Sequence, residues 1–229
     1  MMTNKKTNYQ NQLDALLEKI CTTQKKPSLL LHACCGPCSS YVLEYLCKHF
    51  EISVLFYNPN IYPEQEYKRR LQELLNFYTK FVPAENVRVI QAPYNPEDFY
   101  KTVGTRENPE LANEPERGER CHRCYELRLQ YTYDYACANQ FDYFCTTLSI
   151  SPFKDADMIN EIGMRLSEES EGPQTKPRWL PSDFKKKNGF KRSLELSAEY
   201  GLYRQEYCGC IYSIKNRHCE EQSDTAIHS

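Results

Sequence analysis

Short apolar runs alternate with helical segments along most of this chain, and this alternation constrains the fold more than any other feature. The predicted strands are 28–33, 51–57, 86–91 and 143–149, and the predicted helices are 39–50, 64–80, 123–139, 155–167 and 192–200. Strands that alternate with helices are typical of βαβ units. We therefore expect an α/β fold with a Rossmann-like, mainly parallel sheet and helices on both faces. A Pro-, Asn- and Glu-rich stretch from 95 to 118 predicts a small, mostly helical or irregular insertion that carries the second cysteine pair.

The length of 229 residues suits one domain with short additions. We expect a polar, helical N-terminal extension at 1–26, a single α/β catalytic domain at 27–213, an irregular stretch at 173–189 and a flexible tail at 214–229. The first residues lack the apolar core of a signal peptide, and no window approaches the roughly 18 apolar residues of a membrane span. These features favour a cytoplasmic protein with no membrane partner.

Cysteine is the residue type that points to chemistry. Seven of the twelve cysteines fall into three groups, which are Cys34, Cys35 and Cys38; Cys121 and Cys124; and Cys208 and Cys210. The first group directly follows the first predicted strand, where parallel sheets place their sites. In a reducing compartment, clustered cysteines indicate metal binding or redox catalysis more than structural disulfides.

The spacing of these cysteines leaves three kinds of site open. Four thiolates suit an iron–sulfur cluster, and either Cys34 with Cys35 or Cys35 with Cys38 can join Cys121 and Cys124. The second set also has the Cys-x2-Cys pairs of a zinc site. The two pairs of a zinc ribbon lie only about 15–20 residues apart, whereas 82 residues separate Cys38 from Cys121. A strand, a Cys-Gly-Pro-Cys turn and a helix also resemble a thioredoxin-like redox site.

The remaining cysteines and two histidines show less specific patterns. Cys208-Gly209-Cys210 suits a strained, reducible disulfide or a second metal. His32 and His122 stand beside cysteines and are expected to pack or to donate hydrogen bonds rather than to bind metal. The five remaining cysteines are expected to be ordinary small core residues; they are Cys21, Cys47, Cys137, Cys145 and Cys219.

Charge is segregated although the formal net charge is only −2. Residues 107–119 carry five acids against one internal base, whereas 176–192 carry seven bases against one acid. The basic stretch predicts either a polyanion-binding surface or a solvated loop.

Several blocks of sequence resemble the QueH-type epoxyqueuosine reductases. The blocks are 30–39, 56–63, Glu66-Tyr67 with Arg70, 120–124 with Arg128-Leu129, 146–154, 183–186, Ser193, 203–205 and 207–210. They occur in order and extend from residue 29 to residue 213.

The resemblance implies a function and a set of site residues. It implies reduction of epoxyqueuosine to queuosine in the anticodon loop of a tRNA, with electrons from an external donor. It implies a [4Fe-4S] cluster on Cys34, Cys35, Cys121 and Cys124, and a redox-active pair of Cys208 and Cys210. A further mononuclear iron is also implied, for which Cys38, Cys208 and Cys210 are candidate ligands.

Two hypotheses follow from this chemistry. Tyr57, Lys154 and Asp155 stand at predicted strand ends and are candidate proton donors. An anticodon loop offers single-stranded bases and phosphates. The candidate phosphate contacts are Arg69, Arg70, Lys185, Lys186, Lys187, Lys191 and Arg192.

Overall fold

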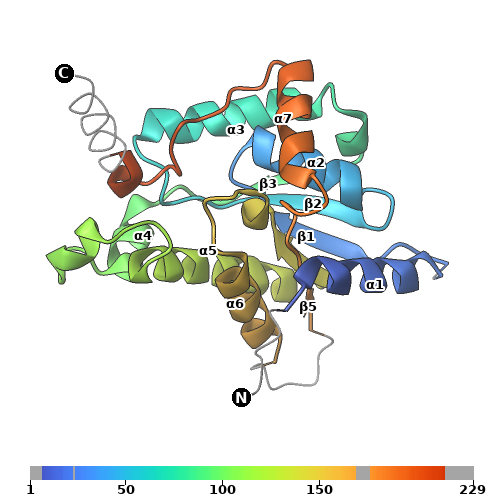
Figure 1. The fold of residues 1–229 in the computed structure, drawn as a ribbon, viewed down its shortest axis with the longest axis horizontal. Coiled ribbons are helices and arrows are strands. Elements are labelled where there is room, and N and C mark those ends of the chain that lie inside the picture. Colours follow the sequence, from blue (N-terminus) through green and yellow to red (C-terminus); the bar gives the residue numbers. More distant parts are fainter. Residues whose placement is uncertain (1–6, 23, 169–175, 215–229) are drawn as a thin grey trace.

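The computed structural model describes residues 7–22, 24–168 and 176–214, and its centre is a parallel sheet (Figure 1). The five strands have the order β3-β2-β1-β4-β5. Their bounds are β1 Ser28–His32, β2 Glu51–Phe56, β3 Arg88–Gln91, β4 Tyr143–Thr146 and β5 Arg178–Trp179. Every neighbouring pair is parallel. The predicted α/β fold is therefore confirmed.

Helices cover both faces of this sheet. The α-helices are α1 Tyr9–Cys21, α2 Gly36–Leu46, α3 Glu64–Tyr78, α4 Pro96–Val103, α5 Glu119–Ala138, α6 Ala156–Glu168 and α7 Gly189–Glu199. Three short 3-10 helices are η1 Val82–Ala84, η2 Pro109–Asn113 and η3 Thr147–Ile150. No helix in these described ranges is long and apolar enough to cross a membrane.

The alternation of side chains along the strands explains the two layers. In β1, Leu29 and Leu31 pack with apolar residues of α1, α2, α3 and α7, whereas Leu30 packs with α5 and α6. Successive strand residues point to opposite faces, so a sheet covered on both sides needs apolar residues at every position. This need explains why the predicted strands are continuous apolar runs.

The reversal in strand order fixes where a site can lie. The chain moves from β1 outwards to β3 and then returns to place β4 on the other side of β1. In parallel sheets a crevice opens at such a switch point, beyond the carboxyl ends of the strands. The loop 33–35 follows β1 there, and η3 with the turn 151–155 follows β4.

The structure differs from the sequence-based expectations in two details. The stretch 173–189, expected to be irregular, contains β5, whose two residues are too few to show a periodicity. Cys121 and Cys124 lie in the first turns of α5 rather than in the insertion, which consists of α4 and η2. The predicted tail 214–229 lies outside the described residues except for Ile214.

The N-terminal helix α1 is part of the packed unit. Its Leu13, Leu17 and Ile20 are buried in the same apolar cluster as β1 and α2. Tyr45 of α2 donates a hydrogen bond of 2.5 Å to Asp14 of α1. The expected polar extension therefore contributes one full helix to the core.

Candidate active site

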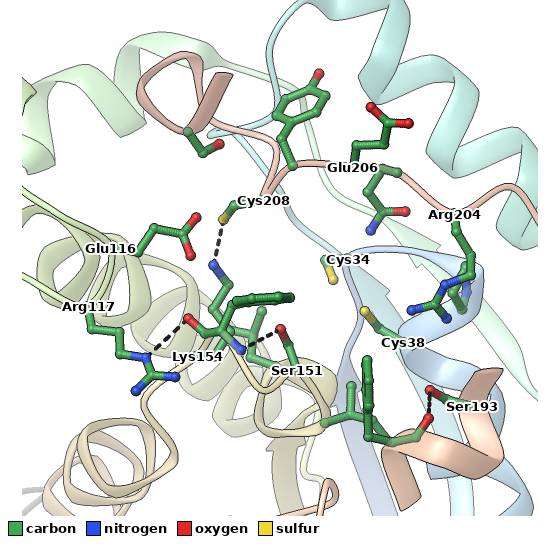
Figure 2. A pocket seen from close by; sticks show the side chains of 18 of the residues that line it. Cys34, Cys38, Glu116, Arg117, Ser151, Lys154, Ser193, Arg204, Glu206 and Cys208 are labelled. Carbon is green, nitrogen blue, oxygen red and sulfur yellow. Dashed lines mark hydrogen bonds between the residues drawn. The ribbon is translucent and has the colours of Figure 1, made fainter. Parts of the chain in front are cut away.

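A cavity of about 680 Å³ opens at the carboxyl ends of β1 and β4 (Figure 2). One wall is the start of α2, with Pro37 and Cys38, and another is the turn after η3, with Phe153 and Lys154. The segment 204–208 closes a third side. This volume lies within the usual range of small-molecule pockets, about 300–1,000 Å³.

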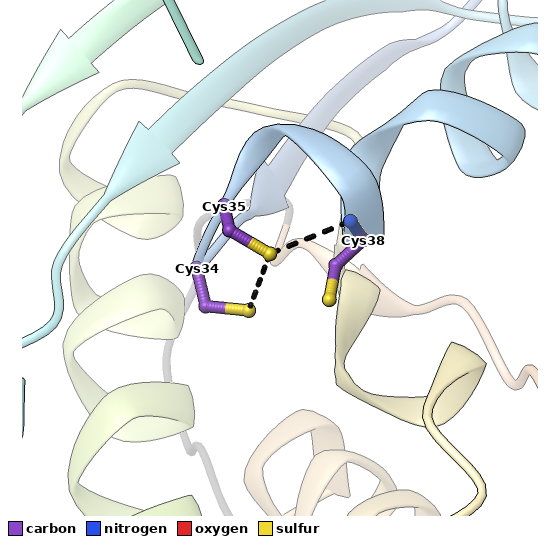
Figure 3. A group of neighbouring side chains, drawn as sticks. All are labelled: Cys34, Cys35 and Cys38. Carbon is purple, nitrogen blue, oxygen red and sulfur yellow. Dashed lines mark hydrogen bonds between the residues drawn. The ribbon is translucent and has the colours of Figure 1, made fainter. Parts of the chain in front are cut away.

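Three thiols gather at the end of β1 (Figure 3). The sulfur atoms of Cys34, Cys35 and Cys38 lie within 4.8 Å of one another. Cys35 caps α2, because its Sγ accepts a hydrogen bond of 3.4 Å from the backbone N–H of Cys38. Gln205, from the other end of the chain, donates a hydrogen bond of 3.1 Å to the same sulfur.

Four further thiols line a small inner cavity of about 10 Å³. They are Cys121, Cys124, Cys208 and Cys210. Cys121 and Cys124 stand three residues apart on α5, so they share one face of that helix. The fold therefore brings the second and third cysteine groups together, although about eighty residues separate them in sequence.

Three residues line both the large and the inner cavity: Arg128, Lys154 and Cys208. The buried Lys154 donates a hydrogen bond of 2.8 Å from its Nζ to the Sγ of Cys208 (Figure 2). Arg128 is 1% exposed and donates from Nε to the carbonyl of Cys124 at 3.1 Å. Its Nη2 has no hydrogen-bond partner among the described residues.

Similarity to known proteins identifies the family of this chain. A family model described as epoxyqueuosine reductase QueH matches residues 29–216. This chain belongs to the QueH family. The epoxyqueuosine reductase QueH of Staphylococcus aureus is 40% identical, with 93% of this chain and 86% of that protein covered. The protein of that name from Streptococcus pyogenes is 39% identical over 94% of this chain and 81% of its own length.

More distant similarities are weaker. The epoxyqueuosine reductase QueH of Thermotoga maritima is 31% identical over 83% of this chain and 92% of its own length. Among solved structures, NMN synthetase from Francisella tularensis covers 90% of this chain and 89% of its own, with 12% identity and a TM-score of 0.38. This structural similarity is too low to bear on the function.

Hydrogen bonds between thiols divide the QueH cysteines into donors and acceptors. The S–H of Cys34 points to Cys35 at 3.8 Å, which raises the pKa of Cys34 to about 11 and lowers that of Cys35 well below its usual range. A hydrogen bond with Cys210, together with the charge of Lys154, lowers the pKa of Cys208, despite its burial. The site therefore has one thiolate-prone sulfur in each of two groups, Cys35 and Cys208.

Burial shapes the other charges in the site. It raises the pKa of Cys121, and that of Cys124 to about 11. Burial opposes the positive charge of Lys154, but the neighbouring Cys208 outweighs this effect and raises the lysine pKa. Both pKa shifts favour a charged lysine beside a thiolate.

The two histidines lie in different environments. His32 is fully buried, with its ring nitrogens 2.8 Å from the Thr146 hydroxyl and 3.0 Å from the Tyr57 carbonyl. Burial lowers its pKa to about 4, so the ring is neutral. His122 is partly exposed and lies 3.7 Å from Glu119.

Of the three candidate proton donors, only Lys154 lines the cavities. Tyr57 stacks on Tyr131 and donates a hydrogen bond of 3.3 Å to Asp98. Asp155 accepts hydrogen bonds from the first backbone N–H groups of α6 and so acts as its cap. Of the three, Lys154 alone is placed to transfer a proton in the cavity.

The seven candidate phosphate contacts lie in different environments. Arg70 is 1% exposed and paired with Glu66 at 2.7 Å, so it cannot meet a phosphate, and this part of the expectation is corrected. Arg69 is exposed and stacks over Tyr203 at 3.4 Å. The ion pairs of the basic stretch are Lys185 and Lys186 with Asp183, Lys187 with Asp14, and Arg192 with Glu44 and Glu195.

Two site residues belong to the resembling blocks of sequence, but the sequence assigns them no role. Arg128 follows Cys121 and Cys124 at intervals of seven and four residues, which is the spacing of one helix face. That spacing could have marked it as a member of the site. Gln205 carries no such signal, because its place beside Cys35 depends on the path of the chain after α7.

Proposed function

We propose that this chain reduces epoxyqueuosine to queuosine in tRNA. The observation that carries the proposal is the meeting of the three-thiol group and the Lys154–Cys208 pair at one cavity. Membership of the epoxyqueuosine reductase family supports the assignment. A cytoplasmic location accords with a tRNA substrate.

The cofactor proposed for this site is a [4Fe-4S] cluster. Thiolates are the ligands that such clusters require, and Cys34, Cys35, Cys121 and Cys124 would hold it. Cys34, Cys35 and Cys121 already belong to one packed cluster of residues. The buried guanidinium of Arg128 fits an anionic thiolate cluster, because a buried cation without a counter-charge is costly. When bound, the cluster would supply single electrons; an additional mononuclear iron remains part of the proposal, with Cys38 as a candidate ligand.

The residues of the chain can balance the reaction. Removing the epoxide oxygen leaves an alkene and water and consumes two electrons and two protons. Two thiols that close to a disulfide release two electrons and two protons, and we assign this role to Cys208 and Cys210. Lys154, hydrogen-bonded to Cys208, can hold a proton at the border of the large cavity. An external electron donor must then reduce the disulfide.

The tRNA surface is proposed to lie beside the cavity mouth. Phe190 and Ser193 of α7 line the cavity, and the exposed Lys186 and Lys191 lie within four residues of Phe190 in the sequence. Replacing both lysines with glutamine is expected to weaken tRNA binding. The slope of log affinity against log salt should fall by roughly 0.7 per lost phosphate contact with a single strand.

Fluorescence anisotropy of labelled tRNA at several salt concentrations measures this slope. Lys48→Gln is the matched control, because Lys48 is exposed and precedes β2, at the amino ends of the strands, whereas the cavity opens at their carboxyl ends. Equal slopes in the parent and the double variant would remove these lysines from the tRNA surface.

The direct test of function is turnover. Anaerobically purified protein with a chemical reductant is expected to convert epoxyqueuosine-containing tRNA to queuosine-containing tRNA, as measured by mass spectrometry of digested nucleosides. Protein that reduces small disulfides but leaves epoxyqueuosine intact would support the thioredoxin-like alternative. Protein that binds tRNA with stoichiometric zinc and no redox activity would support a zinc-stabilised RNA-binding module.

A further inference from the structure

The Cys208-Gly209-Cys210 segment is fastened to α3 by one buried arginine. Arg70 donates from Nη1 to the carbonyl of Cys208 at 3.2 Å and from Nη2 to the carbonyl of Tyr207 at 3.4 Å. Its Nε pairs with Glu66 at 2.7 Å, one turn earlier in α3. All three nitrogens of the guanidinium are thus engaged, and two of them hold the backbone that carries Cys208.

The loop before α3 adds to the same attachment. The backbone N–H of Tyr62 donates to the carbonyl of Gly209 at 2.8 Å, and the hydroxyl of Tyr207 donates to the carbonyl of Tyr62 at 2.6 Å. Three successive carbonyls, from Tyr207 to Gly209, therefore each accept a hydrogen bond from the segment 62–70. The Cys-Gly-Cys backbone has a defined position although it contains no helix or strand.

Glycine at position 209 is required by this contact. Its φ is +122°, a conformation that other residues rarely adopt. A Cβ at this position would lie 3.0 Å from Nη1 of Arg70 and 3.1 Å from Ile61. The glycine lets the guanidinium approach the backbone closely.

We propose that Arg70 is a positioning residue that holds Cys208 and Cys210 in the geometry from which they exchange electrons. This role rests on the proposed function of these two cysteines as a dithiol–disulfide pair. The guanidinium fixes the carbonyls of Tyr207 and Cys208, and so it raises the effective concentration of one thiol near the other. The balanced step is the reaction of both thiols with oxidised glutathione, which gives the Cys208–Cys210 disulfide and two molecules of reduced glutathione.

The test measures the equilibrium constant of this step without any tRNA. Anaerobically purified protein is equilibrated in glutathione buffers, quenched by alkylation and analysed by peptide mass spectrometry. Arg70→Met is expected to lower the equilibrium constant for disulfide formation at least tenfold, which corresponds to about 30 mV for a two-electron couple. The equilibrium constant of Arg70→Lys should lie between those of the parent and Arg70→Met. A lysine keeps the positive charge but cannot reproduce the planar, multidentate contact.

Lys68→Met is the matched control, because Lys68 is a neighbouring basic residue of α3 that is exposed and pairs with Glu64 of the same helix. Its equilibrium constant should equal that of the parent. Arg70→Met should also leave the salt slope of tRNA binding unchanged, whereas a phosphate contact would make it shallower.

A second variant disturbs the contact between Arg70 and the Cys208 segment without removing a buried charge. Gly209→Ala should push the segment away from Arg70 and lower the equilibrium constant to a similar extent. Gly201→Ala is its control, since Gly201 also has a positive φ, +62°, but an added Cβ there meets nothing within 4 Å.

Unchanged equilibrium constants in both Arg70→Met and Gly209→Ala would overturn the positioning role. A parent protein whose two thiols never close to a disulfide would overturn it as well. Failure of the parent to convert epoxyqueuosine, combined with the expected shifts in equilibrium constant, would reject the proposed function and leave the role of Arg70 intact.

Discussion

Anaerobically purified Cys121→Ala protein is expected to lose most of its iron, its visible iron–sulfur absorption and all measurable reductase activity. Cys121 is buried beside Cys124, and burial raises the pKa of both thiols. Such thiols ionise when they bind a metal, because a coordinated thiol loses its proton. Removing one of four thiolates leaves the cluster without a complete set of ligands. Iron content per chain and the absorption spectrum measure this loss directly.

Cys137→Ala is the matched control for this substitution. Cys137 lies near the end of the same helix, α5, and lines neither cavity. The control should keep the iron and the activity of the parent. Iron retained in full by Cys121→Ala would exclude Cys121 from the ligand set, and stoichiometric zinc in the parent would favour a structural site.

Lys154→Met is expected to lower the turnover number by about 10²–10⁴-fold, the usual contribution of a positioned proton donor. It should also slow the alkylation of Cys208 at neutral pH. The pKa of Cys208 is lowered by its hydrogen bond with Cys210 and by the charge of Lys154. Removing that charge raises the pKa, so a smaller fraction of Cys208 is thiolate at pH 7. The pH profile of alkylation should move to higher pH in the variant.

Two variants separate charge from geometry in this prediction. Lys154→Arg keeps the positive charge, so the pKa of Cys208 should stay lowered and its alkylation profile should stay close to that of the parent. Lys185→Met removes a lysine whose partner is Asp183 and should leave the profile unchanged. An identical alkylation profile in Lys154→Met and in the parent would show that Lys154 does not control this thiol.

The fold could be predicted from sequence where the periodicity is long enough to be visible. The apolar runs of β1, β2 and β4 are fully or largely buried, and helices such as α3 show an apolar face over 15 residues. β5 has only two residues, so no pattern could reveal it. The exact start of α2 could not be predicted from hydrophobic periodicity either, because it depends on the cap formed by the Cys35 sulfur.

Residue type located the site, whereas tertiary contacts decided the role of each residue. The cysteine groups were visible in the sequence, and the strand order explains why Cys34 lies near the turn that contains Lys154. The sequence alone does not reveal the role of Arg70. A basic residue in a charged helix predicts a phosphate contact, but only the packed chain shows that its donors face the Cys208 segment.

The contacts of Gln205 with Cys35 and of Arg70 with Cys208 join the beginning of the sheet to the last described part of the chain. Cys208 is made long after β1, so neither contact can form until nearly all of the described chain has been synthesised. Domains generally fold as units. The sulfur group at the end of β1 and the thiols assigned to redox exchange are therefore expected to take their places together, in the last stage of synthesis.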